Sequence, residues 1–102
     1  MSDQTLERVF KALADKNRLN ILKLLRQGER CGCDLLDRLD ISQPTLSHHL
    51  KVLSEAGLVN SVRQGNRIEY RVALASFNQL NTQLDQLIHP EPTCEVRMHE
   101  DI

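Results

Sequence analysis

Hydrophobic residues recur along most of the chain with the spacing of helices. The spacing predicts amphipathic helices over residues 3–14, about 19–25, about 33–39 and 74–88. The second of these is apolar around most of its circumference, so we expect it to be central and buried. Gly28 ends it, and Pro90 and Pro92 stop the last helix.

A further helix is predicted between Ser42, a natural N-cap, and Gly57. Pro44 is tolerated there because the first-turn amides have no intrahelical partner. The inward stripe consists of Leu46, Leu50 and Leu53. At 100° per residue, His48 points almost directly away from this stripe, and His49 lies closer to the buried edge. The outer face is therefore polar.

Two short segments, residues 59–64 and 67–72, lie on either side of Gly65-Asn66, and in the second Ile68, Tyr70 and Val72 alternate with charged residues. This pattern is typical of a β-hairpin with a tight turn. We therefore expect a mainly helical fold with one small hairpin, a winged helix-turn-helix. We expect residues 1–89 to form a single DNA-binding and dimerisation domain and residues 90–102 to form a mobile acidic tail.

The polar face of the helix after Ser42 fits the DNA major groove, because short hydrogen-bonding side chains near its N-terminus can reach base edges. Arginines around the hairpin turn are suited to the backbone or minor groove. The candidate DNA-binding residues are Gln43, Thr45, Ser47, His48, Lys51, Arg63, Arg67 and Arg71. Net charge is −1, but the basic residues concentrate in the first three-quarters of the chain.

Length and composition bound the remaining possibilities. The 102 residues form one domain with a modest core and only three aromatic residues, and such a core is commonly supplemented by a partner subunit. The N-terminus lacks the features of a signal peptide, and no apolar run approaches the roughly 18 residues of a membrane span. We expect a cytoplasmic protein.

Several motifs resemble the ArsR/SmtB family of bacterial metal-responsive repressors, over about residues 6–88. They are Glu29-Arg30-Cys31-Gly32-Cys33-Asp34-Leu35, the string from Ser42 to Leu50, Ala56-Gly57-Leu58-Val59, and Gly65 with Tyr70. The resemblance implies a homodimer that represses a resistance operon and leaves its operator when an inducer binds. Because one recognition helix per subunit reads only a half-site, we expect the operator to be an inverted repeat. It also implies a dimer interface on the first and last helices, where the apolar stripes are Leu6, Val9, Phe10, Leu13, Phe77, Leu80, Leu84, Leu87 and Ile88.

The resemblance also bears on the inducer. The family's zinc site in the last helix is not matched, since only Asp85 and His89 are candidates there. The arsenic-type pattern Cys-x-Cys-Asp-Leu is matched by Cys31 and Cys33, with Leu36 where some members carry a third cysteine. Cys94 is a candidate third ligand, from the tail of either protomer. Thiolates suit soft ions, which favours arsenite or antimonite, with cadmium or zinc as further candidates. DNA binding itself requires no cofactor.

In a regular helix Cys31 and Cys33 would face opposite sides, so we expect the inducer to distort the start of the third helix. An alternative keeps the fold but makes the thiols, perhaps with Cys94, a redox or sulfide sensor. A small thiol oxidoreductase is disfavoured because no Cys-x-x-Cys or βαβ pattern is present. A plain dimerisation module leaves the polar face unexplained. We find no catalytic triad or phosphate loop and expect no enzyme activity.

Overall fold

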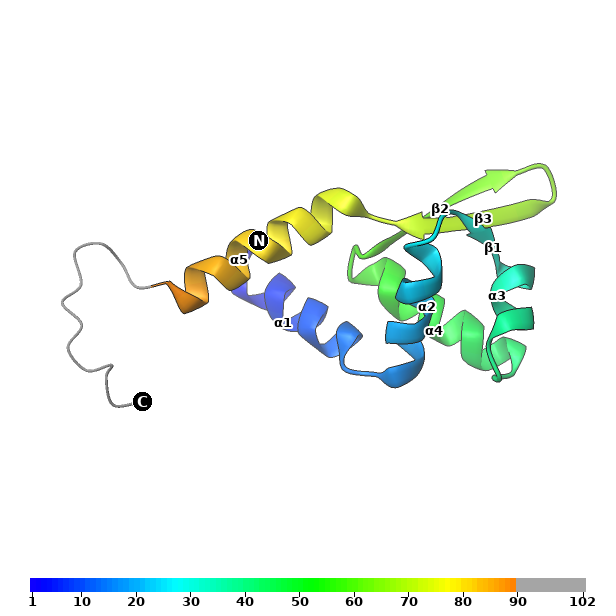
Figure 1. Ribbon diagram of the computed structural model, residues 1–102, viewed down its shortest axis with the longest axis horizontal. Coiled ribbons are helices and arrows are strands. Elements are labelled where there is room, and N and C mark those ends of the chain that lie inside the picture. The colour runs from blue at the N-terminus through cyan, green and yellow to red at the C-terminus, as the bar shows by residue number, and fades with distance from the viewer. Residues whose placement is uncertain (90–102) are drawn as a thin grey trace.

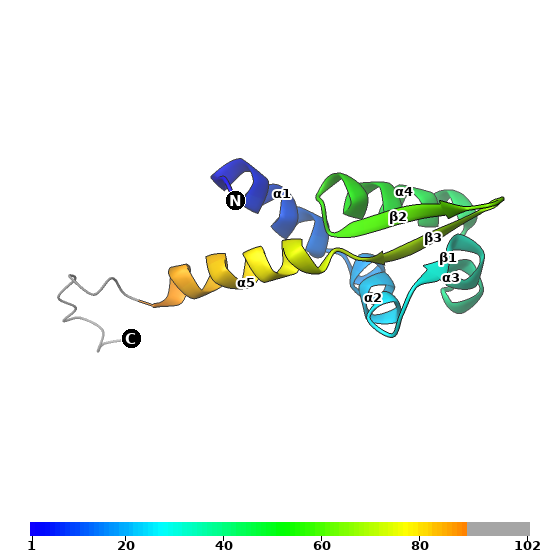
Figure 2. The ribbon, with the colours of Figure 1, turned by 90° about the horizontal axis from the view of Figure 1, so that it is seen from above.

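The computed structural model describes residues 1–89, which form five helices and three strands. In chain order these are α1 (Asp3–Leu13), α2 (Lys16–Leu25), β1 (Arg30–Cys31), α3 (Gly32–Arg38), α4 (Gln43–Glu55), β2 (Val59–Gln64), β3 (Arg67–Val72) and α5 (Leu74–Ile88). The hairpin projects from one end of the molecule, near α3 and α4, whereas α5 extends as an arm at the other end, with α1 on the same side (Figures 1 and 2). The predicted architecture, mainly helical with a small hairpin, is confirmed.

Element bounds agree closely with the pattern of the sequence. Both hairpin strands and α5 have the predicted bounds, whereas α1 ends one residue early and α3 covers Gly32–Arg38 rather than 33–39. The largest difference is in α2, which begins three residues before the predicted start, at Lys16. The predicted mobile tail, with Cys94, lies outside the described residues. None of the helices in residues 1–89 is long and apolar enough to cross a membrane.

The sequence did not predict β1. This two-residue strand pairs antiparallel with β3, which lies between β1 and β2. Arg30 is opposite Tyr70, and Cys31 is opposite Glu69. Two residues are too few to show an alternating pattern, so only the contact with β3 defines the strand. As a result, Cys31 belongs to the same small sheet as the wing hairpin.

The hydrophobic core gathers one apolar face from almost every element. Its largest fully buried side chains are Val9, Ile21, Leu35, Leu53 and Leu58. Leu46, Leu50 and Leu53 of α4 are all buried, as the stripe predicted. The core therefore fixes the face of α4 that turns inward, and with it the face that remains exposed.

The end of α4 is closed by a Schellman motif. Gly57 has a φ of +78°, its N–H donates to the Ser54 carbonyl at 3.0 Å, and the N–H of Leu58 donates to the Leu53 carbonyl at 3.0 Å. A side chain with a Cβ is strained at this φ. The motif turns the chain sharply from the helix into β2, so the wing follows α4 directly.

His49 anchors α4 to the N-terminal helices. It is 7% exposed, and the Arg18 guanidinium lies 3.1 Å from its Nδ1. Because a guanidinium only donates, Nδ1 is the acceptor in this hydrogen bond, and Nε2 lies 4.0 Å from Asp15 Oδ1. Arg18 also donates from Nε to the Ala12 carbonyl at 2.6 Å. The contact therefore joins α1, α2 and α4.

Replacing Asp15 by alanine is expected to lower the free energy of unfolding by about 1–2 kcal/mol, because Asp15 is the N-cap of α2. Its Oδ1 accepts from the Asn17 and Arg18 N–H groups at 2.8 and 3.1 Å. Urea denaturation measures the change, and the exposed Asp37→Ala serves as control, with a change within about 0.5 kcal/mol.

The same variant tests the charge of Asp15. Its backbone hydrogen bond from Arg18, with the Arg18 charge, holds the pKa of Asp15 below the ordinary value. A lowered pKa stabilises the fold at pH values above the ordinary pKa, about 3.9, and this contribution is lost as the pH falls through the folded-state value. The difference between wild type and Asp15→Ala should therefore shrink in acid; a pH-independent difference would show that the charge is irrelevant.

Candidate nucleic-acid interface and thiol pair

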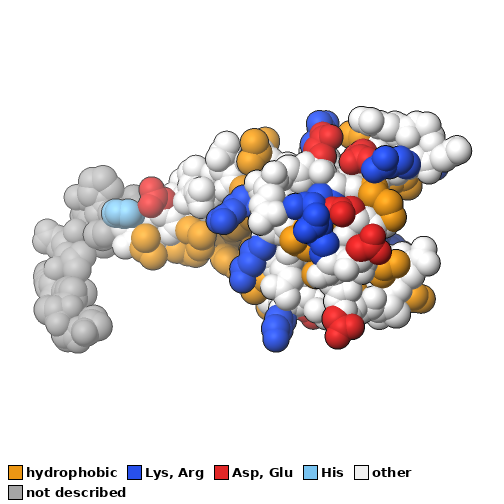
Figure 3. Space-filling model, turned by 45° about the vertical axis from the view of Figure 1, so that its right-hand side comes forward, with side chains coloured by type: hydrophobic (Ala, Val, Ile, Leu, Met, Phe, Trp, Pro, Cys, Tyr) orange, Lys and Arg blue, Asp and Glu red, His pale blue; other side chains and the backbone are white. Residues whose placement is uncertain are grey.

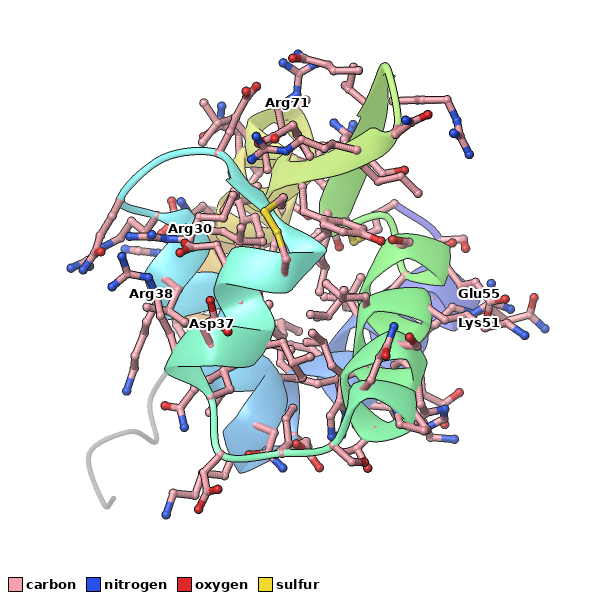
Figure 4. All side chains as sticks on the ribbon, turned by 90° about the vertical axis from the view of Figure 1, so that its right-hand side faces the viewer. Arg30, Asp37, Arg38, Lys51, Glu55 and Arg71 are labelled. Carbon is pink, nitrogen blue, oxygen red and sulfur yellow. A yellow bond between two sulfur atoms is a disulfide. The ribbon has the colours of Figure 1, made fainter. Side chains whose placement is uncertain are left out.

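The exposed face of α4 carries the predicted DNA-reading side chains. Gln43, Ser47, His48 and Lys51 are exposed, and Lys51 extends from the side of α4 away from α3 (Figure 4). Thr45 differs, because it is half-buried and its hydroxyl oxygen accepts a 2.9 Å hydrogen bond from Ser42, whose own oxygen caps the helix. The helix therefore presents a continuous polar strip with Thr45 at its edge.

The three wing arginines do not lie on one face. Side chains alternate along a strand, and paired residues share a face. Arg67 and Arg71 of β3 therefore lie on one side of the hairpin, whereas Arg63 is opposite Ile68 and lies on the other. All three are exposed.

Two of these arginines are already paired. Arg67 Nη2 lies 3.3 Å from Glu69, and Arg71 Nη1 donates to Glu29 at 3.1 Å. Both guanidinium groups are exposed, although the Glu69 side chain is only 17% exposed, and ion pairs at the surface contribute little to stability. DNA phosphates can therefore compete for both guanidinium groups.

Cys31 and Cys33 are joined in a disulfide at the start of α3. Cys31 is the N-cap of the helix, with extended φ and ψ of −77° and 163°, and only Cys33 lies within the first turn. The expectation that the two sulfurs face opposite sides is therefore wrong, because pairing with β3 holds Cys31 outside the helix. Cys31 is 5% exposed and Cys33 is exposed, so the bonded pair lies at the edge of the core, with Cys33 as its more accessible residue.

An ion-pair network fixes the backbone around the two cysteines. Arg30 Nη1 donates to Asp34 Oδ2 at 2.6 Å, and Arg38 Nε donates to the same oxygen at 3.1 Å. The hydrogen bond from Arg30 is the main cause that holds the pKa of Asp34 below its ordinary value. Arg30 and Arg38 lie on the side of α3 away from α4 (Figure 4). This role of Arg30 was not predicted, although its spacing of four from Asp34 is a recognisable signal.

The described residues contain no cluster of three or more His, Cys, Asp or Glu side chains of the kind that holds a metal ion. In α5, Asp85 and His89 contact each other at 3.5 Å with no further ligand nearby in residues 1–89. Cys94, the predicted third sulfur, lies outside the described residues. Within residues 1–89, the candidate inducer site therefore consists of two sulfurs, those of Cys31 and Cys33.

The predicted dimer residues divide into two groups. Val9 and Leu80 are buried within the single chain, so their burial needs no partner. The others, on α1 and α5, leave apolar surface uncovered, and Figure 3 shows such surface along the arm. Phe10 is 40% exposed, and the exposure of α5 increases toward its end, from 37% at Leu84 to 67% at Leu87 and 72% at Ile88; Leu6, Leu13 and Phe77 are half-buried.

Comparison with known proteins agrees with this geometry. Residues 15–61 match the family described as "Bacterial regulatory protein, arsR family". The chain is 40% identical over 94 residues to an arsenical resistance operon repressor of Staphylococcus xylosus, covering 92% of this chain and 90% of that protein.

Two solved structures share the fold. An ArsR-like transcriptional regulator from Rhodococcus superposes with a TM-score of 0.77 at 34% identity, covering 82% of this chain and 79% of that one. A homodimeric winged helix-turn-helix DNA-binding domain from Mycobacterium bovis has a TM-score of 0.67 at 33% identity, covering 89% and 95%. The sequence motifs, the winged helix-turn-helix and these relatives agree: the chain belongs to the arsR family of bacterial regulatory proteins.

Proposed function

We propose that this DNA-binding transcriptional repressor of the arsR family leaves its operator when trivalent arsenic or antimony binds the thiolates of Cys31 and Cys33. The observation that carries the proposal is the position of the two sulfurs, side by side at the start of α3. Soft thiolates prefer soft ions of this class. The Staphylococcus xylosus relative is an arsenical resistance operon repressor, which supports the same inducer here.

Release follows from what the thiol pair touches. Cys31 pairs with Glu69 of the wing strand, and both cysteines border the same cleft as Gln43 and Ser47 of α4. An ion held by both sulfurs therefore acts on the two elements that we assign to DNA. The mechanism does not require α3 to unwind, since the sulfurs already lie together.

We further propose that residues 1–89 act as one DNA-binding and dimerisation unit and that the homodimer binds an inverted repeat. One recognition helix per protomer reads one half-site, and two-fold symmetry sets half-sites about 34 Å apart. The uncovered apolar residues at the end of α5 support dimerisation through this helix.

Fluorescence anisotropy with DNA from the protein's own promoter tests the function. Reduced protein is bound to the labelled DNA and then titrated with arsenite, antimonite, cadmium and zinc. We expect arsenite or antimonite to release the DNA at the lowest concentration. Release by none of these ions at concentrations that saturate the thiols would contradict the proposal.

A second candidate function has its own supporting observation, the Cys31–Cys33 disulfide itself. In this alternative, oxidation of the pair and not ion binding releases the DNA. Operator affinity measured for the fully reduced and the fully oxidised protein, without added ions, distinguishes the two. Equal affinities exclude the redox mechanism.

The recognition residues are expected to differ from the wing in how they affect DNA. Ser47→Ala and His48→Ala should each weaken specific operator binding by about 1–3 kcal/mol and reduce the preference for the operator sequence.

Arg67→Ala should weaken binding to all DNA sequences. It should also reduce the dependence of log affinity on log salt concentration by about one unit of slope, as loss of a phosphate contact does. Exposed His89→Ala and Arg26→Ala are the matched controls. If His48→Ala and His89→Ala bind the operator with the same affinity and sequence preference, the assignment of α4 as the recognition helix is wrong.

A further inference from the structure

A cleft of about 490 Å³ opens beside the thiol pair, between α3, the first turns of α4 and the wing. This volume lies within the range of small-molecule sites. Both cysteines border the cleft, and its apolar walls are formed by Leu36, Leu46, Leu50, Ile68 and Tyr70. Gln43, Ser47 and Arg67 form part of its polar border. The cleft therefore combines two sulfurs with an apolar lining.

The number of sulfurs limits what the pair can hold. Trivalent arsenic forms three bonds, and the pair supplies two of them. Leu36, one turn after Cys33, brings an apolar side chain to the cleft where a third thiol would complete the set. No third Cys, His, Asp or Glu joins the pair within residues 1–89. An apolar neighbour favours carbon over oxygen as the third substituent, because burying an unpaired hydroxyl costs free energy.

We propose that the cleft holds the organic substituent of a monosubstituted trivalent arsenical, with an aryl group or one of similar size. This inference rests on the proposed function of the thiol pair and specifies its ligand. Two As–S bonds form and two As–OH bonds break; the two thiol protons leave with the hydroxides as two water molecules. Arsenic stays trivalent throughout.

The binding form of the pair is the dithiol. Two equivalents of a low-molecular-weight thiol convert the Cys31–Cys33 disulfide into this form by exchange, and are themselves oxidised to a disulfide. Cys33 is exposed whereas Cys31 is buried, so Cys33 is the more accessible point of attack. Arsenical binding then requires no further electron transfer.

A substituent in the cleft also affects DNA binding. Ser47 and Arg67 border the cleft from α4 and from the wing, respectively. An aryl group between them holds these two elements at a distance set by the ligand rather than by DNA. The size of the substituent is therefore expected to determine the concentration at which the operator is released.

The test compares phenylarsine oxide, methylarsonous acid and arsenite as releasing agents on the reduced full-length protein bound to labelled operator. The phenyl and methyl compounds make the same two As–S bonds and differ only in the apolar group. We expect half-maximal release by the phenyl compound at a concentration roughly tenfold lower than by the methyl compound, from burial of the ring. In Ile68→Asn this ratio should fall to near one, whereas Val62→Asn, in the wing but not on the cleft, should retain it.

A second variant probes the third bond of arsenic. Leu36→Cys supplies a third thiol, so arsenite should release DNA at a concentration on the order of tenfold lower. The phenyl compound should gain nothing, because its third bond is to carbon. Circular dichroism confirms that each variant is folded.

The outcomes separate the inference from the function on which it rests. Equal potency of the phenyl and methyl compounds, or a phenyl preference that survives Ile68→Asn, overturns the cleft assignment while release by arsenite upholds the function. An equal gain for arsenite and the phenyl compound in Leu36→Cys also overturns it. Failure of all three compounds to release DNA overturns both.

Discussion

Replacing Cys31 and Cys33 together by serine is expected to leave operator binding intact and to abolish release by arsenite. In the wild type, arsenite should lower operator affinity on the order of 5- to 150-fold, the usual range of coupling between two sites. In the double variant the factor should be one, because hydroxyl groups do not replace thiolates as ligands of a soft ion. Anisotropy titrations with and without arsenite measure both factors.

DNA binding should survive this replacement because neither cysteine is part of the polar strip on α4. Serine is also a good N-cap, so Ser at position 31 can accept from the Asp34 N–H as the Cys31 sulfur does now at 3.3 Å. Proton release on arsenite addition gives a second readout, since thiols must ionise to bind. The double variant should release none from this site.

Cys94→Ser is the matched control, the same replacement outside the pair. It is expected to retain release, and a weakened response would identify a third sulfur supplied by residues 90–102. Normal release from the double variant would show that the inducer site lies elsewhere in the protein.

A charge at the end of α5 is expected to have the second large effect. Leu87→Glu should convert the dimer to monomers and reduce operator affinity at least about a hundredfold, because two linked half-sites bind far more tightly than one. Leu87 is 67% exposed in the single chain, so the substitution should leave the fold of the protomer unchanged. Within a dimer interface, the same carboxylate would be buried without a partner.

Gln86→Glu provides the control for this experiment. It adds the same charge one residue away, about 100° around α5 and off the apolar stripe, and should affect neither assembly nor binding. Sedimentation equilibrium reports the mass of each variant, and anisotropy reports its affinity. A Leu87→Glu protein that remains dimeric would place the interface away from the end of α5.

The sequence predicted those features that depend on local pattern. Gly65-Asn66 located the hairpin, alternation along residues 67–72 indicated its second strand, and the stripe on Leu46, Leu50 and Leu53 determined which face of α4 is polar. The register of the hairpin was not foreseen, and it separates Arg63 from the other two wing arginines.

The features that were missed depend on contacts between distant parts of the chain. The conformation of Cys31 comes from its pairing with Glu69, and this pairing, not a helical angle, decides where its sulfur lies. Arg18 meets His49 across 31 positions, and no local pattern reports such a contact. Helix periodicity therefore gave the wrong geometry for the candidate inducer site, even though it identified the two residues.

The two-residue strand β1 also has a consequence for the order in which the protein folds. The hairpin closes over a turn of two residues, whereas Arg30 must find Tyr70 across 40 positions of chain. Closing so long a loop costs conformational entropy, and this cost is offset only when further contacts have formed. We therefore expect β1 to join last during folding and to open first in the native protein, with its amides exchanging fastest among the three strands. Cys31 can then leave its pairing with Glu69 of β3, and the thiol pair can bind an ion, while the recognition helix α4 remains folded.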